Sequence, residues 1–322
     1  METGLLALAE GLTRQDRVAL GRALSLIESQ RPEDIPLRAA LLNSLPQKTL
    51  SYRIGFTGAP GAGKSTLIDA LGSYVLGVEP EATIAVLTVD PSSWRSGGSI
   101  LADQTRMRRL STHPRVFMRT FASGGHLGGL HPRIREAVHL CESAGFTYLF
   151  LESVGTGQSE IELRYVCDFF LYVALPNMGD EVQGIKRGLM EAMDGIALNK
   201  SDTISSDGLR RVTFQLETAL HLLRPQEYER LFVLPVSALR EEGIADLWQA
   251  LINHRLSESD LRIRRQSQET YWLERYWQET LSIWLQNSPH GTFYQSLKAR
   301  LAQGDSLWNL MHAIAHHFGL TP

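Results

Sequence analysis

The chain has 322 residues, of which 43% are hydrophobic and 21% are charged, and its formal net charge is -3. This composition is typical of a globular protein, and the near balance of charges argues against a general binder of nucleic acid or anionic membranes. The start of the chain lacks the basic region of a secretion signal, and no apolar run approaches the roughly 20 residues of a membrane-spanning helix. Two cysteines, Cys141 and Cys167, are too few for a disulfide framework or a C-x-x-C metal pair. We therefore expect a cytoplasmic protein with no nucleic-acid partner and no membrane partner.

Residues 1–48 are expected to form a helical N-terminal extension. Apolar residues such as Leu5, Val18 and Leu24 recur at helical spacing, with arginines and glutamates between them. Pro32 and Pro36 are expected to interrupt this pattern.

Residues 49–256 alternate short, β-prone apolar runs with helical stretches. The expected strands are Tyr52–Thr57, Thr83–Val89, Val116–Phe121, Phe146–Leu151, Phe169–Leu175, Gly195–Leu198 and Leu231–Val236. Several of these runs are apolar throughout, as in strands that are covered on both faces. The alternation predicts an α/β fold with a mostly parallel, doubly wound sheet, in which ligands bind at the carboxyl ends of the strands.

Residues 257–322 lack a strand signal and are expected to form a C-terminal helical arm. Trp272, Tyr276, Trp277 and Trp284 mark an aromatic-rich amphipathic helix. Such a stripe either packs against the chain's own core or forms an interface between copies. We predict the second, and hence a homodimer.

The segment Gly58–Thr66 fits the phosphate-binding pattern G-x-x-x-x-G-K-[ST], and it stands between a predicted strand and a helical pattern, as that motif requires. Lys64 is expected to reach the β- and γ-phosphates and to act in catalysis, and Ser65 is expected to bind Mg²⁺. Backbone N–H groups and the helix N-terminus favour the remaining phosphate charge. The expected nucleotide-binding residues of this loop are Gly58, Gly61, Ala62, Gly63, Lys64, Ser65 and Thr66.

The segment Asn199–Asp202 reads N-K-x-D directly after an apolar run, and it is the candidate base site. A carboxylate at Asp202 can accept hydrogen bonds from guanine N1–H and N2–H₂, a donor pair that adenine lacks, so GTP and GDP are favoured over adenine nucleotides. Asn199 is expected to tie this loop to the phosphate loop, and the Lys200 stem is expected to lie over the base. The other residues expected at the base are Ser237, Ala238 and Leu239.

Three carboxylates are candidates for the metal site, because oxygen ligands suit Mg²⁺. Asp90 and Glu152 each end a predicted strand, and Asp103 follows a glycine hinge. The alternative for each is a turn residue or a helix cap. The expected Mg²⁺ ligands are Ser65, Asp90, Asp103 and Glu152.

Glycine-flanked segments after the strands are candidate switch loops, whose order depends on the γ-phosphate. Gly155 is expected to sense that phosphate through its N–H group. Gln158 and Lys186 lie in such segments and are candidates for positioning water or charge, with a solvated loop as the alternative. Together, the expected catalytic residues are Lys64, Asp103, Glu152, Gln158 and Lys186.

With these motifs in place, the sequence resembles the MeaB/ArgK family, the GTPases associated with methylmalonyl-CoA mutase and related adenosylcobalamin-dependent acyl-CoA mutases. The resemblance runs over most of the chain and is densest at Gly58–Thr66, at Asp90-Pro-Ser-Ser, at Glu152–Glu160, at Gly179–Lys186 and at Asn199–Asp202. It implies an α/β GTPase core with helical extensions, often dimeric through the C-terminal one. It also implies a chaperone that gates cobalamin loading and protects the mutase.

The chain departs from the family pattern in its candidate switches. Ala102-Asp103-Gln104 stands where family members usually have Gly-Asp-Lys, and the residues at 94 and 95, Trp and Arg, are bulkier than the usual ones. Two other functions are alternatives. A nickel-insertion GTPase would carry a Cys/His cluster near the switches or a His-rich N-terminus, and a small-molecule kinase, as the older ArgK name suggested, would pass phosphate to a small acceptor.

Overall fold

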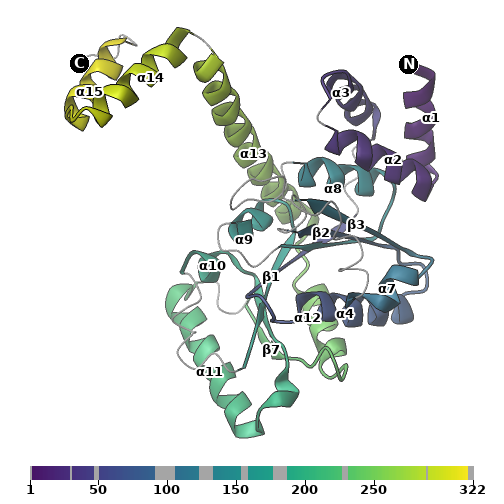
Figure 1. The fold of residues 1–322 in the computed structure, drawn as a ribbon. Helices are drawn as coiled ribbons and strands as arrows, with labels where there is room; N and C mark the ends of the chain where they lie inside the picture. The colour runs from purple at the N-terminus through teal and green to yellow at the C-terminus, as the bar shows by residue number, and fades with distance from the viewer. Residues whose placement is uncertain are drawn as a thin grey trace. The chain divides into compact units, whose positions relative to one another are not determined.

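A computed structural model describes residues 2–29, 31–46, 51–90, 106–122, 133–153, 159–176, 187–226, 231–287 and 289–317. By its contacts the chain divides into two compact units, Met1–Arg265 and Gln266–Pro322. The first unit contains the sheet (Figure 1). The finer division into residues 1–48, 49–256 and 257–322 stays a prediction.

One sheet of seven strands forms the centre of the first unit. The strands are β1 (Tyr52–Thr57), β2 (Ile84–Asp90), β3 (Val116–Ala122), β4 (Tyr148–Glu152), β5 (Phe169–Ala174), β6 (Gly195–Leu198) and β7 (Val233–Pro235). Their order is β3-β2-β4-β1-β5-β6-β7, and every pairing between these strands is parallel. Each predicted apolar run became one strand, which confirms the α/β class.

Helices and short 3₁₀ turns connect the strands. They are α4 (Lys64–Val78), α7 (Arg108–Thr112), α8 (Ile134–Ser143), α9 (Ser159–Glu162), η1 (Leu163–Tyr165), α10 (Arg187–Ala192), η2 (Ser201–Thr203), α11 (Ser206–Leu223) and α12 (Ile244–Asn253). In Figure 1, α4, α7 and α12 lie on one side of the sheet, and α8 and α9 lie on the other. Both faces are therefore covered, which explains why the strands are apolar throughout.

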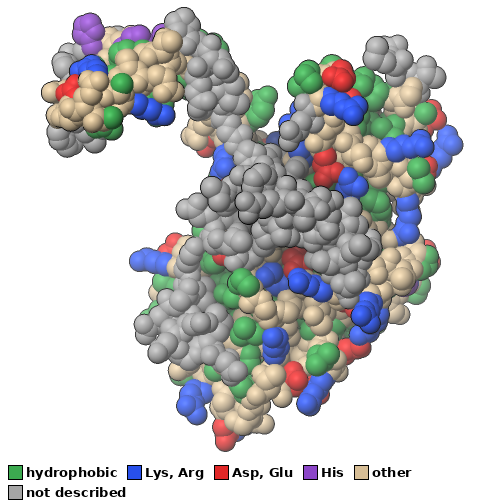
Figure 2. Space-filling view, viewed as in Figure 1, with side chains coloured by type: hydrophobic (Ala, Val, Ile, Leu, Met, Phe, Trp, Pro, Cys, Tyr) green, Lys and Arg blue, Asp and Glu red, His purple; other side chains and the backbone are tan. Residues whose placement is uncertain are grey.

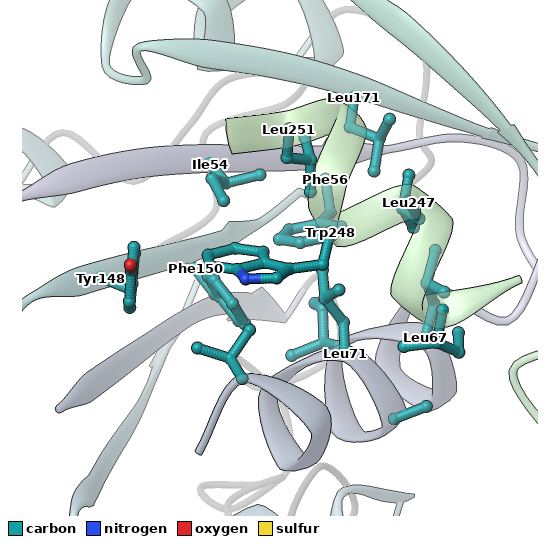
Figure 3. Close-up of a cluster of buried hydrophobic side chains, with 14 of the residues drawn as sticks. Ile54, Phe56, Leu67, Leu71, Tyr148, Phe150, Leu171, Leu247, Trp248 and Leu251 are labelled. Carbon is teal, nitrogen blue, oxygen red and sulfur yellow. The ribbon is translucent and has the colours of Figure 1, made fainter. Parts of the chain in front are cut away.

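The main core lies between the sheet and the helices α4 and α12 (Figure 3). Trp248 of α12 packs edge-on against Tyr148 of β4, with ring centroids 5.0 Å apart. Phe56 of β1 meets Phe150 of β4 in the same way, at 5.3 Å. Because each fully buried side chain of this size contributes about 1.5–3 kcal/mol, this layer fixes α4 against β1. The phosphate loop joins those two elements.

The opposite face of β1 packs closely against the segment that leads into β5. A Cβ atom added to Gly55 would lie 2.8 Å from Cys167 Sγ, so only glycine fits there. Both cysteines are buried and unoxidised, and burial raises the pKa of the Cys167 thiol to about 12. They are packing residues of the core, and neither is in a disulfide.

The N-terminal extension forms α1 (Glu2–Thr13), α2 (Arg17–Glu28) and α3 (Asp34–Ser44), as predicted. Asp16 caps α2 by accepting a hydrogen bond of 2.8 Å from Val18 N. The helical pattern breaks around Pro32, but Pro36 lies inside the first turn of α3. The expectation that Pro36 interrupts the helix is therefore wrong, because first-turn N–H groups have no intrahelical partner to lose.

The C-terminal part forms α13 (Glu258–Asn287), α14 (Pro289–Ala302) and α15 (Leu307–His317). Several apolar side chains on α13 are exposed, among them Leu273, Tyr276 and Trp277, each between 68% and 69%. Among the described residues, none of the helices combines the length and the hydropathy needed to cross a membrane. On the face drawn in Figure 2, basic and acidic side chains are interspersed over the first unit.

Two arginines in the first turns of α13 enter a buried ionic cluster at the amino ends of β5 and β6. Arg265 donates to both carboxylate oxygens of Asp168, at 3.0 and 2.7 Å, and to the carbonyl oxygen of Ser51 at 2.8 Å. Arg264 donates to Asp194 at 2.6 Å. Asp168 and Asp194 directly precede the two strands, so this cluster lies at the edge of the sheet opposite the predicted nucleotide loops.

Candidate nucleotide site

The phosphate loop runs from the end of β1 to the start of α4, and two of its glycines are required by close approaches. Gly58 has φ +141°, and a Cβ there would lie 2.2 Å from the carbonyl oxygen of Val173. Gly63 has φ +85°, and a Cβ there would lie 2.5 Å from Asn199 Nδ2. Gly61 also has a positive φ. The backbone is therefore bent around the space in front of α4, which is the arrangement that phosphate binding needs.

Lys64 opens α4 and is only 8% exposed. Its Nζ donates to the carbonyl oxygens of Gly58 at 2.7 Å and Ala59 at 3.2 Å, so the ammonium lies over the loop. Burial lowers the pKa of Lys64, and the carboxylates of Glu152 and Glu160 oppose that shift. A buried cation held by neutral carbonyl groups can exchange them for phosphate oxygens, which are stronger acceptors.

Ser65 and Glu152 meet beside Lys64. The Ser65 hydroxyl donates to Glu152 Oε1 at 2.9 Å, which brings the first turn of α4 to the end of β4. The register of β2 and β4 places Thr88 opposite Glu152. Asp90, two positions further along β2, extends the strand beyond this point, and its side chain lies outside the described part of the structure. A hydroxyl and a carboxylate are hard oxygen donors, so the residues present fit Mg²⁺.

The base loop is tied to the phosphate loop by one buried side chain. Asn199 Nδ2 donates to the carbonyl oxygen of Ala62 at 2.8 Å, and Asn199 Oδ1 accepts from Ala238 N at 3.1 Å. Lys200 turns the chain with φ +59°, and its Cε lies 4.0 Å from the Cβ position of Gly63. Three loops that follow β1, β6 and β7 are thus joined at one point.

Asp202 lies in η2, directly after the turn at Lys200. A hydrogen bond from the Ser237 hydroxyl and, more weakly, the charge of Arg240 lower the pKa of its carboxyl. Arg240 Nε is 3.4 Å from Asp202 Oδ2. Asp202 is therefore an ionised, half-buried acceptor, as recognition of the guanine edge requires. Ser237 is itself fixed by paired backbone hydrogen bonds with Glu242, of 2.9 and 3.1 Å.

The structure thus brings most of the predicted site residues together. Those in or directly beside the joined loops are Gly58, Gly61, Ala62, Gly63, Lys64, Ser65, Glu152, Asn199, Lys200, Asp202, Ser237 and Ala238. Thr66 lies exposed in the first turn of α4, and Leu239 is exposed next to Ala238. Asp103, Gly155, Gln158 and Lys186 lie outside the described residues.

Two charged residues near Lys64 were not predicted. Glu160 is buried in α9, and its carboxylate raises the pKa of Lys64, whereas the guanidinium of Arg106 lowers it. Each stands beside a glycine-bearing candidate switch segment. A charged side chain at the border of such a segment is the signal that could have found them.

Comparison with known proteins places this site in a family. The family model described as methylmalonyl-CoA mutase-associated GTPase MeaB matches residues 20–289. The GTPase ArgK of Escherichia coli is 40% identical over 280 residues, which cover 84% of each chain. The methylmalonic aciduria type A homolog of Mus musculus is 36% identical over 286 residues, which cover 84% of this chain and 68% of that protein. A crystal structure of a LAO/AO transport system kinase superposes with a TM-score of 0.79 at 29% identity and covers 99% of both chains.

The family match spans most of the chain, and relatives of 40% identity carry the name GTPase. Together with the joined phosphate and base loops, it identifies a P-loop enzyme that binds guanine nucleotide and hydrolyses GTP. The chain belongs to the MeaB family of methylmalonyl-CoA mutase-associated GTPases.

Proposed function

We propose that this GTPase is a Mg²⁺-dependent chaperone of an adenosylcobalamin-dependent acyl-CoA mutase of the methylmalonyl-CoA mutase type. It gates cofactor loading and protects the mutase through its GTP cycle. Two comparisons support the partner: the family description names that mutase, and a mouse relative is a methylmalonic aciduria type A homolog. A cytoplasmic location remains a prediction from the sequence.

The proposed binding of GTP is supported by one geometric observation. Asn199 hydrogen-bonds to Ala62 of the phosphate loop and to Ala238 of the loop after β7, so it joins the phosphate loop to the base loop. In this proposal Asp202 accepts from guanine N1–H and N2–H₂ while Lys64 holds the β- and γ-phosphates. Lys64 is held by a buried hydrogen bond to Gly58, and Asp202 is held by the Ser237 hydroxyl, so both groups are positioned before any ligand arrives and little ordering entropy opposes binding.

The hydrolytic step rests on charge placed around the γ-phosphate. Ser65 and Glu152 are the described residues that would hold Mg²⁺, with Asp90 and Asp103 as the further proposed ligands. When bound there, Mg²⁺ would neutralise negative charge on the phosphate oxygens. Lys64 stabilises the same charge from the loop side, because its ammonium donates into the loop. Gly155, Gln158 and Lys186 keep their proposed roles in sensing the γ-phosphate and positioning water.

The C-terminal arm is proposed as the dimer interface. Tyr276, Trp277 and Trp284 of α13 are all more than half exposed. Exposed aromatic side chains at helical spacing are costly in water and typical of interfaces. Sedimentation of the full chain against a variant with Tyr276→Ser and Trp277→Ser tests this assignment, and a monomeric native protein would contradict it.

The chaperone proposal is tested with purified mutase. The native protein is expected to associate with the mutase, and replacing GTP by GDP is expected to change the rate at which the mutase takes up adenosylcobalamin. Lys64→Ala is the matched control, because it leaves the exposed surface of the protein unchanged and removes the response to GTP and GDP. If no association is seen with either nucleotide, the chaperone role fails while GTP hydrolysis stands.

A phosphotransferase is the second candidate, because the structural relative with the TM-score of 0.79 is titled a transport system kinase. A kinase passes the γ-phosphate to an acceptor, whereas a hydrolase passes it to water. GTP labelled in the γ-position distinguishes them. Label recovered only as inorganic phosphate, in the presence of protein and small-molecule acceptors, eliminates the kinase.

A further inference from the structure

The short helix α7 lies against the helix that begins with the phosphate-binding lysine. Leu110 N donates to Asp69 Oδ1 of α4 at 3.0 Å, and this contact is buried. A Cβ added to Gly72 would lie 2.8 Å from Leu110 Cδ1, so the two helices pack as closely as glycine allows. The position of α7 is therefore fixed relative to α4 and hence to the phosphate loop.

Arg109, the neighbour of Leu110, reaches from the same helix to the loop after β7. Its guanidinium donates a hydrogen bond to Glu241 and pairs with it, while its Nε is 3.7 Å from Asp69 Oδ2. Arg109 thus stands between a carboxylate of α4 and a carboxylate of the loop that follows β7. The hydrogen bond to Glu241 is the largest cause of the raised pKa of Arg109.

Glu241 belongs to a tight loop whose other members contact the predicted guanine acceptor. Arg240 is 3.4 Å from Asp202, and Glu242 exchanges two backbone hydrogen bonds with Ser237, the residue whose hydroxyl donates to Asp202. Glu241 itself has φ +60°, an unusual value for a residue with a side chain. Holding Glu241 in place therefore helps to hold Ser237 and Arg240 against Asp202.

We propose that Arg109 is a positioning residue for guanine binding: through Glu241 it fastens the base loop to the helix that carries the phosphate loop. Asn199 is the inner tie between the two halves of the site, and Arg109 is the outer tie. The inference rests on the proposed role of Asp202. It predicts that Arg109 acts on affinity for the base and leaves the phosphate site and the hydrolytic step unchanged.

The test is a double-mutant cycle of Arg109→Ala, Glu241→Ala and the double variant. Arg109 and Glu241 are 51% and 53% exposed, so each single change is expected to weaken GDP binding by about two- to fivefold. The double variant is expected to bind GDP as tightly as either single variant, because each single change already removes the contact between the two side chains. KM for GTP rises, kcat stays, and GDP dissociates faster.

Two controls separate positioning from general damage. Inorganic triphosphate, which has no base, should inhibit GTP hydrolysis equally well in the native protein and in Arg109→Ala. Arg210→Ala removes an exposed ion pair with Asp207 on α11 and should leave GDP affinity unchanged. Arg109→Lys keeps the charge and should restore most of the affinity.

Strictly additive losses in the cycle, or an equal loss of triphosphate inhibition, would overturn the inference. The same experiments distinguish an error about Arg109 from an error about the guanine-binding site. If Asp202→Asn leaves the GTP preference unchanged, the base site itself is misassigned. If Asp202→Asn changes the preference while the Arg109 cycle shows no coupling, the base site stands and only the outer tie is lost.

Discussion

Asn199 donates its side-chain amide to the carbonyl oxygen of Ala62 at 2.8 Å, and the two residues lie 137 positions apart in the chain. The same side chain accepts from Ala238 N. A single buried amide therefore sets the spacing between the loop that binds phosphate and the loops that bind the base. Its replacement should affect affinity and stability together.

Asn199→Ala is expected to weaken GDP binding by about tenfold or more and to lower the free energy of unfolding by about 1–3 kcal/mol, because two buried partners lose their hydrogen bonds. Calorimetric titration with GDP and thermal unfolding measure the two effects. Asn253→Ala, at an exposed asparagine paired with Gln249, is the matched control and should change neither. Native-like affinity in Asn199→Ala would show that the tie is dispensable.

Glu152→Gln keeps a side chain that can contact Ser65 but removes its charge. A neutral amide is a poorer Mg²⁺ ligand, so the Mg²⁺ concentration for half-maximal hydrolysis is expected to rise about tenfold or more. Chelation with EDTA should abolish hydrolysis in the native protein. Glu217→Gln on α11 serves as the control. An unchanged Mg²⁺ requirement would remove Glu152 from the metal site.

The buried ammonium of Lys64 predicts a pH dependence of affinity. Its pKa in the free protein is below the ordinary value of 10.5, and bound phosphates would raise it, so binding takes up a proton at alkaline pH. GDP affinity should therefore be greatest below the lowered pKa and should fall as pH rises through it toward 10.5. Lys64→Gln lacks this group and should show only the dependence that comes from guanine. A native profile that matches that of Lys64→Gln would contradict the assignment.

Two arginines near the start of α13 are expected to differ in how much they contribute to the free energy of unfolding. The side chains of Arg265 and Asp168 are only 12% and 1% exposed, so Arg265→Gln leaves a buried carboxylate without its partner and should cost about 3–5 kcal/mol. Arg262→Gln, one turn away on the same helix, breaks a pair with Glu258 whose partners are 78% and 81% exposed, and should cost less than about 1 kcal/mol. Denaturant unfolding compares them. Equal losses would mean that the cluster does not fasten α13.

Much of this fold could be predicted from the sequence because its signals are local. Apolar runs such as Tyr52–Thr57 and Gly195–Leu198 are buried on both faces, and each became one strand with the same bounds. The phosphate motif and the N-K-x-D motif concentrate their chemistry in a few consecutive residues. Their meeting point follows from the rule that the carboxyl ends of parallel strands share one edge.

The parts that could not be predicted depend on pairs that are distant in the chain. Arg109 and Glu241 are 132 positions apart, and Arg265 and Asp168 are 97 apart. Nothing near either arginine distinguishes it from a solvated surface residue. Pro36 shows the opposite error, since a local rule about proline was applied without knowing that it falls in a first helical turn.

The most direct test of guanine recognition at the joined loops is the pair of dissociation constants for GDP and XDP, measured on the native protein and on Asp202→Asn. Xanthine carries an oxygen where guanine carries the N2 amino group, so an amide at 202 can donate to xanthine but leaves the guanine donors poorly matched. The native protein should bind GDP far more tightly than XDP, and Asp202→Asn should reverse that order. An Asp202→Asn protein that still prefers GDP by the native margin would contradict the account.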